Sequence, residues 1–261
     1  AYIDPNPSLG HAGVHNERYA YYLAERIKGG VGLVTFGAVT VHPTADYEVH
    51  HGLGKAYDKA ALPGMKLATE MVHQYGGKVF IQLMHAGVHT TGVLSKRPAW
   101  GASAVPGLGV EVGWEQAKAM EIEEIQEVID YYGRCAENAI EGGFDGVEIH
   151  GGTSYLPHQF LSPFWNRRTD EYGGSLENRL RFFMQVIDLV KKVLPPTMAL
   201  GVRLTMDDFV PAGMTVNDMK EVARRLEATG KIDYINVNVG FHGPFIVSPT
   251  MYEPHGIAVP Y

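Results

Sequence analysis

The chain has 261 residues, of which 45% are hydrophobic and 20% are charged, an ordinary composition for a globular protein. Its formal net charge of −7 disfavours a nucleic-acid partner, and no apolar run reaches the about 18 residues that a membrane span needs. The single cysteine, Cys135, excludes an internal disulfide and suits the reducing cytoplasm, so we expect a cytoplasmic protein.

The start of the chain shows no secretory signal pattern, and Ala1 stands where an initiator Met would be, so we expect a fragment. Short runs rich in β-branched residues then alternate with helical patterns. They predict strands over residues 31–36, 78–83, 144–150, 198–204 and 233–239. Because none has an alternating polar face, we expect parallel strands buried on both sides.

Two helices are the clearest of those between the strands. Ile122–Glu141 carries apolar residues at helical spacing and ends at Gly142, directly before a strand. A second helix opens at Thr215, where Asp218 three residues later resembles a capping box, and it ends near Gly230. Residues 86–120 are rich in Gly and Pro without periodicity, which predicts a long loop.

Repeated strand–helix units fit either a (β/α)8 TIM barrel or a doubly wound sheet. A doubly wound dinucleotide fold usually carries a G-x-G-x-x-G turn after its first strand, and no such turn follows a strand here. We therefore predict an α/β protein with a barrel fold. Because only five strands are visible where a barrel has eight, we expect one barrel domain over residues 1–261, truncated at both ends and containing about strands two to six.

Polar or small residues stand where the predicted strands end, and in a barrel these ends meet at one mouth. They are, in chain order, Ala38, Gln82, His150, Arg203, Asn236 and Asn238. Such a mouth suits the flat ring of a flavin. An amide can pair with the donor and acceptor edge of its pyrimidine ring, and a cation can stand beside the edge where negative charge develops on reduction.

Five stretches of the sequence resemble the Old Yellow Enzyme family, the NADH:flavin oxidoreductases. They are GGVGLVTFGAVTVHP, VFIQLMHAG, GFDGVEIHGGTSYLPHQFLSP, NRRTDEYGGSLENRLRF and GVRLTMDDF, in the family's order. The segments SYLP and ATGKIDYINV look more like the multidomain branch, which includes dienoyl-CoA reductases and the enzymes that demethylate trimethylamine and dimethylglycine. The resemblance implies an FMN-dependent oxidoreductase on a TIM barrel.

The resemblance also implies roles for individual residues. Its flavin contacts fall on Ala38, Gln82 and Arg203. Its catalytic positions fall on His150, Thr153 and Tyr155. The implied cofactor is FMN, with NAD(P)H as electron partner. The multidomain branch adds an iron–sulfur cluster and a second nucleotide in a C-terminal part outside this chain. The implied partner is a small-molecule substrate, with neither nucleic acid nor membrane.

Three positions depart from the family pattern. Family members usually have His or Asn at Thr153, an acidic residue at Gly37 and Arg at Val88. A threonine hydroxyl donates a single hydrogen bond from a shorter side chain, so we expect it to polarise a substrate carbonyl more weakly.

Two directions of hydride transfer stay open. In ene reduction, His150 and Thr153 would hold the carbonyl oxygen of an α,β-unsaturated substrate while Tyr155 protonates the α-carbon. In oxidative demethylation, His150 and Tyr155 would orient an N-methylated amine. The weaker carbonyl clamp and the likeness to the demethylating branch favour the amine slightly.

Two hypotheses of other classes remain. A metal-dependent barrel hydrolase would use His85, His89 and His150, since two histidines four residues apart can share a metal on a helix. A flavin-free remnant without catalysis is the other, because the family's phosphate cradle lies in strands not seen here. We expect the RTDEYGGSLENR segment to be structural, with a turn at Gly173 and Gly174 and with Asp170, Arg179 and Arg181 pairing there.

Overall fold

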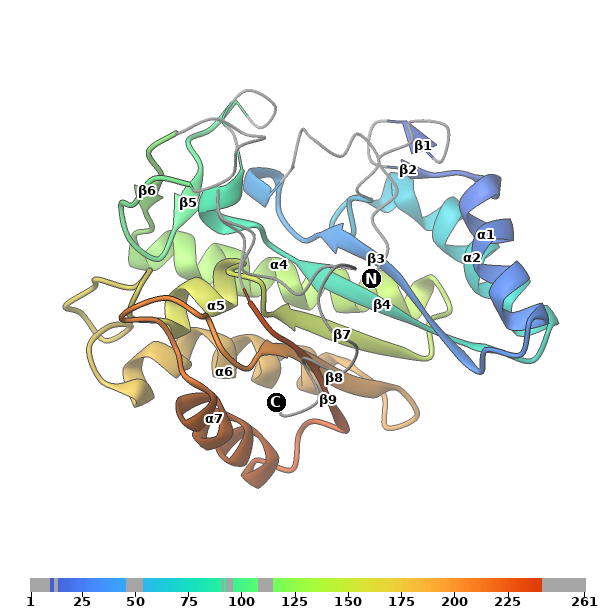
Figure 1. Cartoon of the computed structure of the whole chain (residues 1–261). Coiled ribbons are helices and arrows are strands. Elements are labelled where there is room, and N and C mark those ends of the chain that lie inside the picture. The colour runs from blue at the N-terminus through green and yellow to red at the C-terminus, as the bar shows by residue number, and fades with distance from the viewer. Residues whose placement is uncertain are drawn as a thin grey trace.

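A computed structural model describes residues 10–11, 14–45, 54–90, 92, 96–107 and 115–240 (Figure 1). Its centre is a five-stranded parallel sheet whose strands stand in sequence order. The strands are β3 (Leu33–Thr40), β4 (Lys78–Met84), β7 (Gly146–Gly151), β8 (Ala199–Thr205) and β9 (Tyr234–Asn238). All five predicted strands are therefore confirmed, with their ends shifted by at most four residues.

A helix follows each of the first four strands of the sheet, as the alternating pattern predicts. The longer helices are α1 (Glu17–Lys28), α2 (Leu62–Gln74), α4 (Ile122–Glu141), α6 (Leu176–Val193) and α7 (Val216–Ala228). The shorter elements are α5 (Leu156–Leu161), β1 (Gly10–His11), β2 (Val14–His15), β5 (Trp100–Gly101) and β6 (Lys118–Ala119), with the single turns Pro43–Ala45, Lys59–Ala61 and Gly87–His89. Within the described ranges, no helix is long and apolar enough to cross a membrane.

Local sequence signals set the ends of the helices. Helix α4 has the predicted bounds, because Glu121 and Glu124 form a capping box and Gly143 takes a φ of 81° just beyond its end. Helix α7 begins at the predicted capping box of Thr215 and Asp218. Ile122 is the exception to the predicted buried face of α4. It is 40% exposed, because it lies at the first position of the helix, before the packed turns begin.

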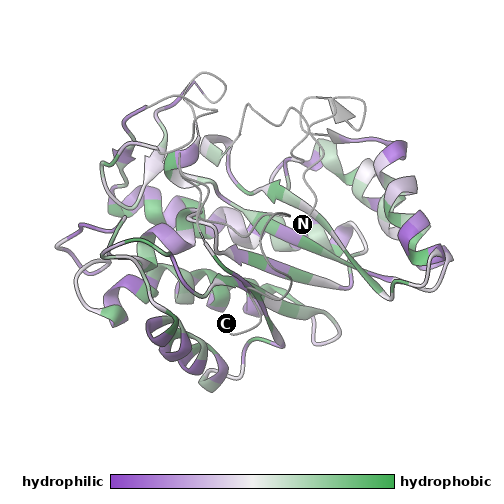
Figure 2. Cartoon of the chain, viewed as in Figure 1, coloured by the Kyte–Doolittle hydropathy of each residue, from purple (hydrophilic) through white to green (hydrophobic). Residues whose placement is uncertain are grey.

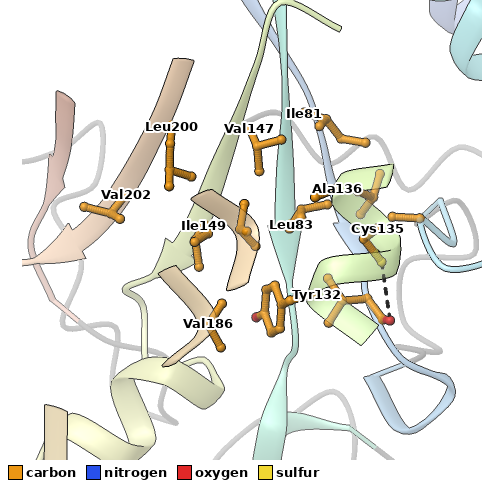
Figure 3. Close-up of a cluster of buried hydrophobic side chains, with 14 of the residues drawn as sticks. Ile81, Leu83, Tyr132, Cys135, Ala136, Val147, Ile149, Val186, Leu200 and Val202 are labelled. Carbon is orange, nitrogen blue, oxygen red and sulfur yellow. Dashed lines mark hydrogen bonds between the residues drawn. The ribbon is translucent and has the colours of Figure 1, made fainter. Parts of the chain in front are cut away.

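One face of the sheet is apolar and packs against α4 and α6. The strand residues on this face are fully buried, and they are Ile81, Leu83, Val147, Ile149, Leu200 and Val202. Figure 3 shows them facing Tyr132, Cys135 and Ala136 of α4 and Val186 of α6. Burial of each such aliphatic side chain stabilises the fold by about 1.5–3 kcal/mol. Figure 2 shows the same contrast, with apolar strands inside and polar helix surfaces outside.

The alternate strand residues face the other way and are more polar. At the N-terminal end of this face, the rings of Phe80 and Tyr234 stack with centroids 5.7 Å apart. Glycines make room for them, since a Cβ at Gly146 would lie 2.8 Å from the Phe80 ring and a Cβ at Gly201 would lie 2.0 Å from the Tyr234 ring. The polar residues therefore lie nearer the C-terminal ends of the strands.

The RTDEYGGSLENR segment is structural, as predicted, but its ion pair is different. Asp170 pairs with Arg168 at 2.6 Å rather than with Arg179 or Arg181. The Nε groups of those two arginines instead donate to the backbone carbonyls of Leu161 and Glu171. The turn residue Gly174 has a φ of 77°, and α6 then begins at Ser175, whose hydroxyl accepts the N–H of Asn178.

Residues 86–120 contain more regular structure than the predicted loop. Strands β5 and β6 form a short parallel pair, with Trp100 opposite Lys118. The Arg168 guanidinium donates to the backbone carbonyls of Ala102 and Met120, at 3.0 and 2.7 Å. A distant arginine therefore fastens both sides of the pair, a contact that the local sequence pattern does not reveal. Residues 91, 93–95 and 108–114 of this stretch lie outside the described residues.

Candidate active site at the C-terminal ends of the strands

All six residues predicted for the site lie at the C-terminal ends of the sheet strands or directly beyond them. Ala38, Gln82, His150 and Arg203 belong to β3, β4, β7 and β8 respectively. Thr153 and Tyr155 lie in the connection between β7 and α5. The parallel register places His150 opposite Arg203, and Arg203 opposite Asn236 of β9.

His150 and Tyr155 form the centre of this region. His150 is 5% exposed, and its Nδ1 accepts the backbone N–H of Gly152 at 3.3 Å. In a neutral ring the proton is therefore on Nε2, which makes that atom a donor. The rings of His150 and Tyr155 meet edge to face with centroids 4.6 Å apart. Tyr155 also belongs to a small apolar cluster with Ala38, Met84 and Ala86.

Deeper on the same face, a buried carboxylate links three strands. The Gln82 side-chain amide donates to Oε1 of Glu148, and the Asn236 amide donates to Oε2 at 3.0 Å. Gln82 is fully buried and Glu148 is 1% exposed. Tyr234 lies beside them, and its pKa is raised, chiefly by burial and then by the Glu148 carboxylate.

Two buried polar atoms on this face have no hydrogen-bond partner among the residues that the structure describes. They are Oε1 of Gln82, an acceptor, and Nε of Arg203, a donor. A buried group left unpaired costs about 1–3 kcal/mol, so such atoms are rare in folded proteins. A ligand with an N–H donor and an electron-rich acceptor edge would satisfy both. The pyrimidine ring of a flavin has both, so the residues present fit FMN.

The end of β3 is irregular where it reaches the site. The register with β4 shifts between Phe36 and Val39, and Gly37 has a φ of 119°. Its N–H donates to the Tyr19 hydroxyl at 3.0 Å, and a Cβ at this position would lie 2.9 Å from the Val39 nitrogen. The conformation at this position therefore requires glycine. The shift leaves Ala38 in the Tyr155 cluster.

Thr153 has a strained backbone that the ends of β8 and β9 hold in place. Its φ is 56°, a left-handed conformation that is costly for a β-branched residue. Its N–H donates to the Thr205 hydroxyl at 2.6 Å, and its own hydroxyl accepts from the Asn238 amide at 2.8 Å. The Thr205 hydroxyl donates in turn to Asn238 Oδ1 at 3.0 Å. Strain of this kind is often found where a functional group must be held at one position.

The metal-hydrolase hypothesis finds no support. His85 hydrogen-bonds Thr44 through Nε2 at 3.0 Å, whereas His89 hydrogen-bonds Ser154 through Nε2 at 3.1 Å. Burial, and secondarily the neighbouring His42, holds the pKa of His85 well below its usual range. Nowhere in the described part of the chain do three potential metal ligands gather.

Three residues of this region were missed by the sequence interpretation. Glu148, Thr205 and Tyr19 hold Gln82, Thr153 and Gly37 respectively. The period of two along a strand could have found Glu148, because it stands two residues before His150 and so shares its face. Tyr19 carries no such signal, since it lies on a helix far away in the sequence.

Comparison with known proteins first defines the class. The structure superposes on morphinone reductase in complex with tetrahydroNAD with a TM-score of 0.78 and 28% identity, over 88% of this chain and 67% of that one. That protein is a TIM barrel of the Old Yellow Enzyme type, so the predicted barrel fold is confirmed for the strands present. The chain belongs to the NADH:flavin oxidoreductase / NADH oxidase family, whose sequence profile matches residues 8–247. This is the family that the sequence resemblance indicated.

Two curated relatives differ in what they act on. N,N-dimethylglycine/sarcosine dehydrogenase of Chromohalobacter salexigens is 33% identical over 88% of this chain. Cinnamate reductase of Clostridium sporogenes is 33% identical over 99% of this chain. The chain spans 34% of the first relative's length and 41% of the second's. The family thus includes both an amine dehydrogenase and an alkene reductase, the two classes left open by the sequence.

Proposed function

We propose that this chain binds FMN over the C-terminal ends of β3, β4, β7 and β8 and forms the barrel part of a hydride-transferring enzyme. The observation that carries the proposal is the pair of unpartnered buried atoms, Gln82 Oε1 and Arg203 Nε, on the same sheet face as His150. Ala38 leaves room for a close approach, and the Arg203 cation favours the anionic reduced ring. Bound FMN would supply hydride acceptance or donation at its N5 atom.

Oxidative demethylation of an N-methylated amine is the direction we favour. His150 and Tyr155 would orient the amine in a partly buried site. Two points support this direction. Thr153 offers a carbonyl only one hydrogen, from a side chain shorter than the His or Asn that the resemblance implies at this position. The dimethylglycine/sarcosine dehydrogenase relative also acts on this class of substrate.

Ene reduction is the second candidate, and the cinnamate reductase relative favours it. Nε2–H of His150 and the Thr153 hydroxyl would donate to the carbonyl oxygen and stabilise the enolate charge that develops there. The Tyr155 hydroxyl would protonate the α-carbon. This direction needs both donors at once, whereas the amine direction needs only His150.

Stopped-flow flavin spectroscopy of Thr153→Val separates the two directions. If the substrate is an amine, the rate of flavin reduction by N-methylated amines should be nearly unchanged in Thr153→Val and should fall in His150→Ala. If the substrate is an enone, Thr153→Val should slow the reoxidation of the flavin by a simple enone. The activation barrier should rise by about 2.7–4 kcal/mol. Fast enone turnover that collapses in Thr153→Val, without reduction by any amine, would refute the amine proposal.

For the whole protein we further propose NAD(P)H as electron partner, with an iron–sulfur cluster and a second nucleotide held by other domains. This chain cannot hold a cluster through cysteines, because its one cysteine, Cys135, is buried with its thiol directed at the Val41 carbonyl. Iron and nucleotide analysis of the full-length gene product tests this proposal. Redox cofactors and a single free thiol also support a cytoplasmic setting, which cell fractionation would test.

A further inference from the structure

Glu148 is a buried acid that the proposed chemistry does not use. It lies within β7, two residues before His150 and on the same face of the sheet, and it is 1% exposed. Its two oxygens receive the side-chain amides of Gln82 from β4 and Asn236 from β9. A carboxylate in a strand interior is costly to bury, so a role that only an acceptor can fill is worth seeking.

The carboxylate decides which way round the Gln82 amide stands. An amide has nearly the same shape with its oxygen and nitrogen exchanged, so only its hydrogen-bond partners fix its orientation. An ionised carboxylate accepts and never donates, so it must receive the NH2 end of Gln82. The other end, Oε1, is then left buried without a partner.

We propose that Glu148 is a positioning residue that presents the Gln82 oxygen, and not its NH2 group, to the ligand. The inference rests on the proposed FMN site and sharpens it. With an oxygen facing the ring, Gln82 must be matched by a ring N–H, which in a flavin is N3–H. Exchange of Glu148 for a glutamine would replace one acceptor oxygen by a donor. A glutamine there can accept from only one of the two amides, so Gln82 would no longer be held with its NH2 end towards position 148.

The test uses FMN and N3-methyl-FMN, which lacks the N3 hydrogen, and measures their dissociation constants by flavin fluorescence. The unaltered chain should bind N3-methyl-FMN at least about tenfold more weakly than FMN, since a buried acceptor is left unpaired. In Glu148→Gln the ratio should fall towards one. The swapped chain, Gln82→Glu with Glu148→Gln, has only acceptor oxygens at position 82. It should therefore again bind FMN at least about tenfold more tightly than N3-methyl-FMN. Glu141→Gln, the same change at an exposed site on α4, should keep it.

Side-chain amide hydrogen exchange measured by NMR on the flavin-free chain gives a second readout. The Gln82 NH2 should be protected, and rapid exchange there would overturn the inference even if the variants did not fold. A Glu148→Gln chain that keeps the tenfold preference for FMN would overturn it as well, while leaving the proposed flavin site intact. Absence of FMN binding by the unaltered chain would overturn the proposed function and this inference together.

Discussion

The two faces of the sheet are built from alternate residues of the same strands, yet they differ in polarity. Towards α4 and α6, Ile81, Ile149 and Leu200 are fully buried against apolar neighbours. On the opposite face, Gln82 and Arg203 each keep a buried polar atom without a partner. The first face stabilises the fold, whereas we propose that a ligand completes the second.

The magnitudes support this division. Two unpaired buried groups together cost about 2–6 kcal/mol, a large part of the roughly 5–15 kcal/mol by which a typical domain is stable. Such a cost is compatible with folding because the apolar face supplies the stability. Binding of a matching ligand recovers the lost hydrogen bonds. Variants on the two faces should therefore separate stability from flavin affinity.

The largest effect is expected from a cavity on the apolar face. Leu200 is fully buried between β7 and β9, so Leu200→Ala should lower the free energy of unfolding by about 2–5 kcal/mol. Urea denaturation measures this loss. The folded fraction should bind FMN with unchanged affinity. A variant that keeps its stability but loses FMN would contradict the division between the faces.

A buried imidazole on the apolar side should make stability depend on pH. His15 packs against the rings of Tyr19 and Phe36, and burial lowers its pKa to about 4. The unfolded chain, with a pKa near the ordinary 6.5, then binds more protons than the folded one between pH 6.5 and 4. Stability should therefore be full above pH 6.5 and fall by about 3 kcal/mol as the pH drops to 4.

His15→Phe is the control for this pH effect. It keeps a ring in the same apolar setting, so its stability should depend less on pH, by the same roughly 3 kcal/mol over this window. The comparison is made by urea titrations of both chains at pH 4, 5, 6 and 7. Parallel curves for the two proteins would show that His15 is not buried as a neutral ring.

On the polar face, removal of Arg203 should change the flavin more than the fold. Arg203→Met keeps an apolar stem and deletes the unpaired Nε, so we expect the free energy of unfolding to stay level or rise. The midpoint potential of bound FMN should fall by about 30–60 mV, because a charge-assisted hydrogen bond to the reduced ring is lost. Potentiometric titration tests this, and an unchanged midpoint would remove Arg203 from the flavin's surroundings.

The smallest effect concerns the strained turn. Asn tolerates the left-handed conformation better than a β-branched residue does, so Thr153→Asn should stabilise the chain by about 1 kcal/mol. Thr153→Val keeps the branch and loses the Asn238 bond, so it should not stabilise. Thermal melts compare the two. If both variants melt together above the unaltered chain, strain at this residue is not the cause.

Much of the fold and of the polar face of the sheet can be predicted from the sequence. Runs of β-branched residues reveal the strands, and the capping residues Thr215 and Asp218 reveal where α7 begins. His150, Arg203 and Gln82 are found because each stands at the end of an apolar run. Parallel strands bring such ends to one edge of the sheet, so their proximity follows from topology alone.

What could not be predicted depends on contacts between distant segments. Asp170 was expected to pair with Arg179 or Arg181, but it pairs with Arg168, whose guanidinium also holds residues 102 and 120 far away in the sequence. β3 runs four residues beyond its predicted end, because Gly37 lets the strand continue through an irregularity. The sequence does not distinguish Glu148 from an ordinary acidic residue in a strand, because its partners Gln82 and Asn236 lie on other strands.

The central claim is that the polar face is completed by a flavin, and one measurement tests it most directly. The double variant Gln82→Leu with Arg203→Met removes both unpaired atoms, and FMN affinity and unfolding free energy are measured on the same samples. We predict an affinity at least about 100-fold lower, from two lost hydrogen bonds, in a double variant that still unfolds cooperatively. Unchanged FMN affinity in a folded double variant would contradict the claim.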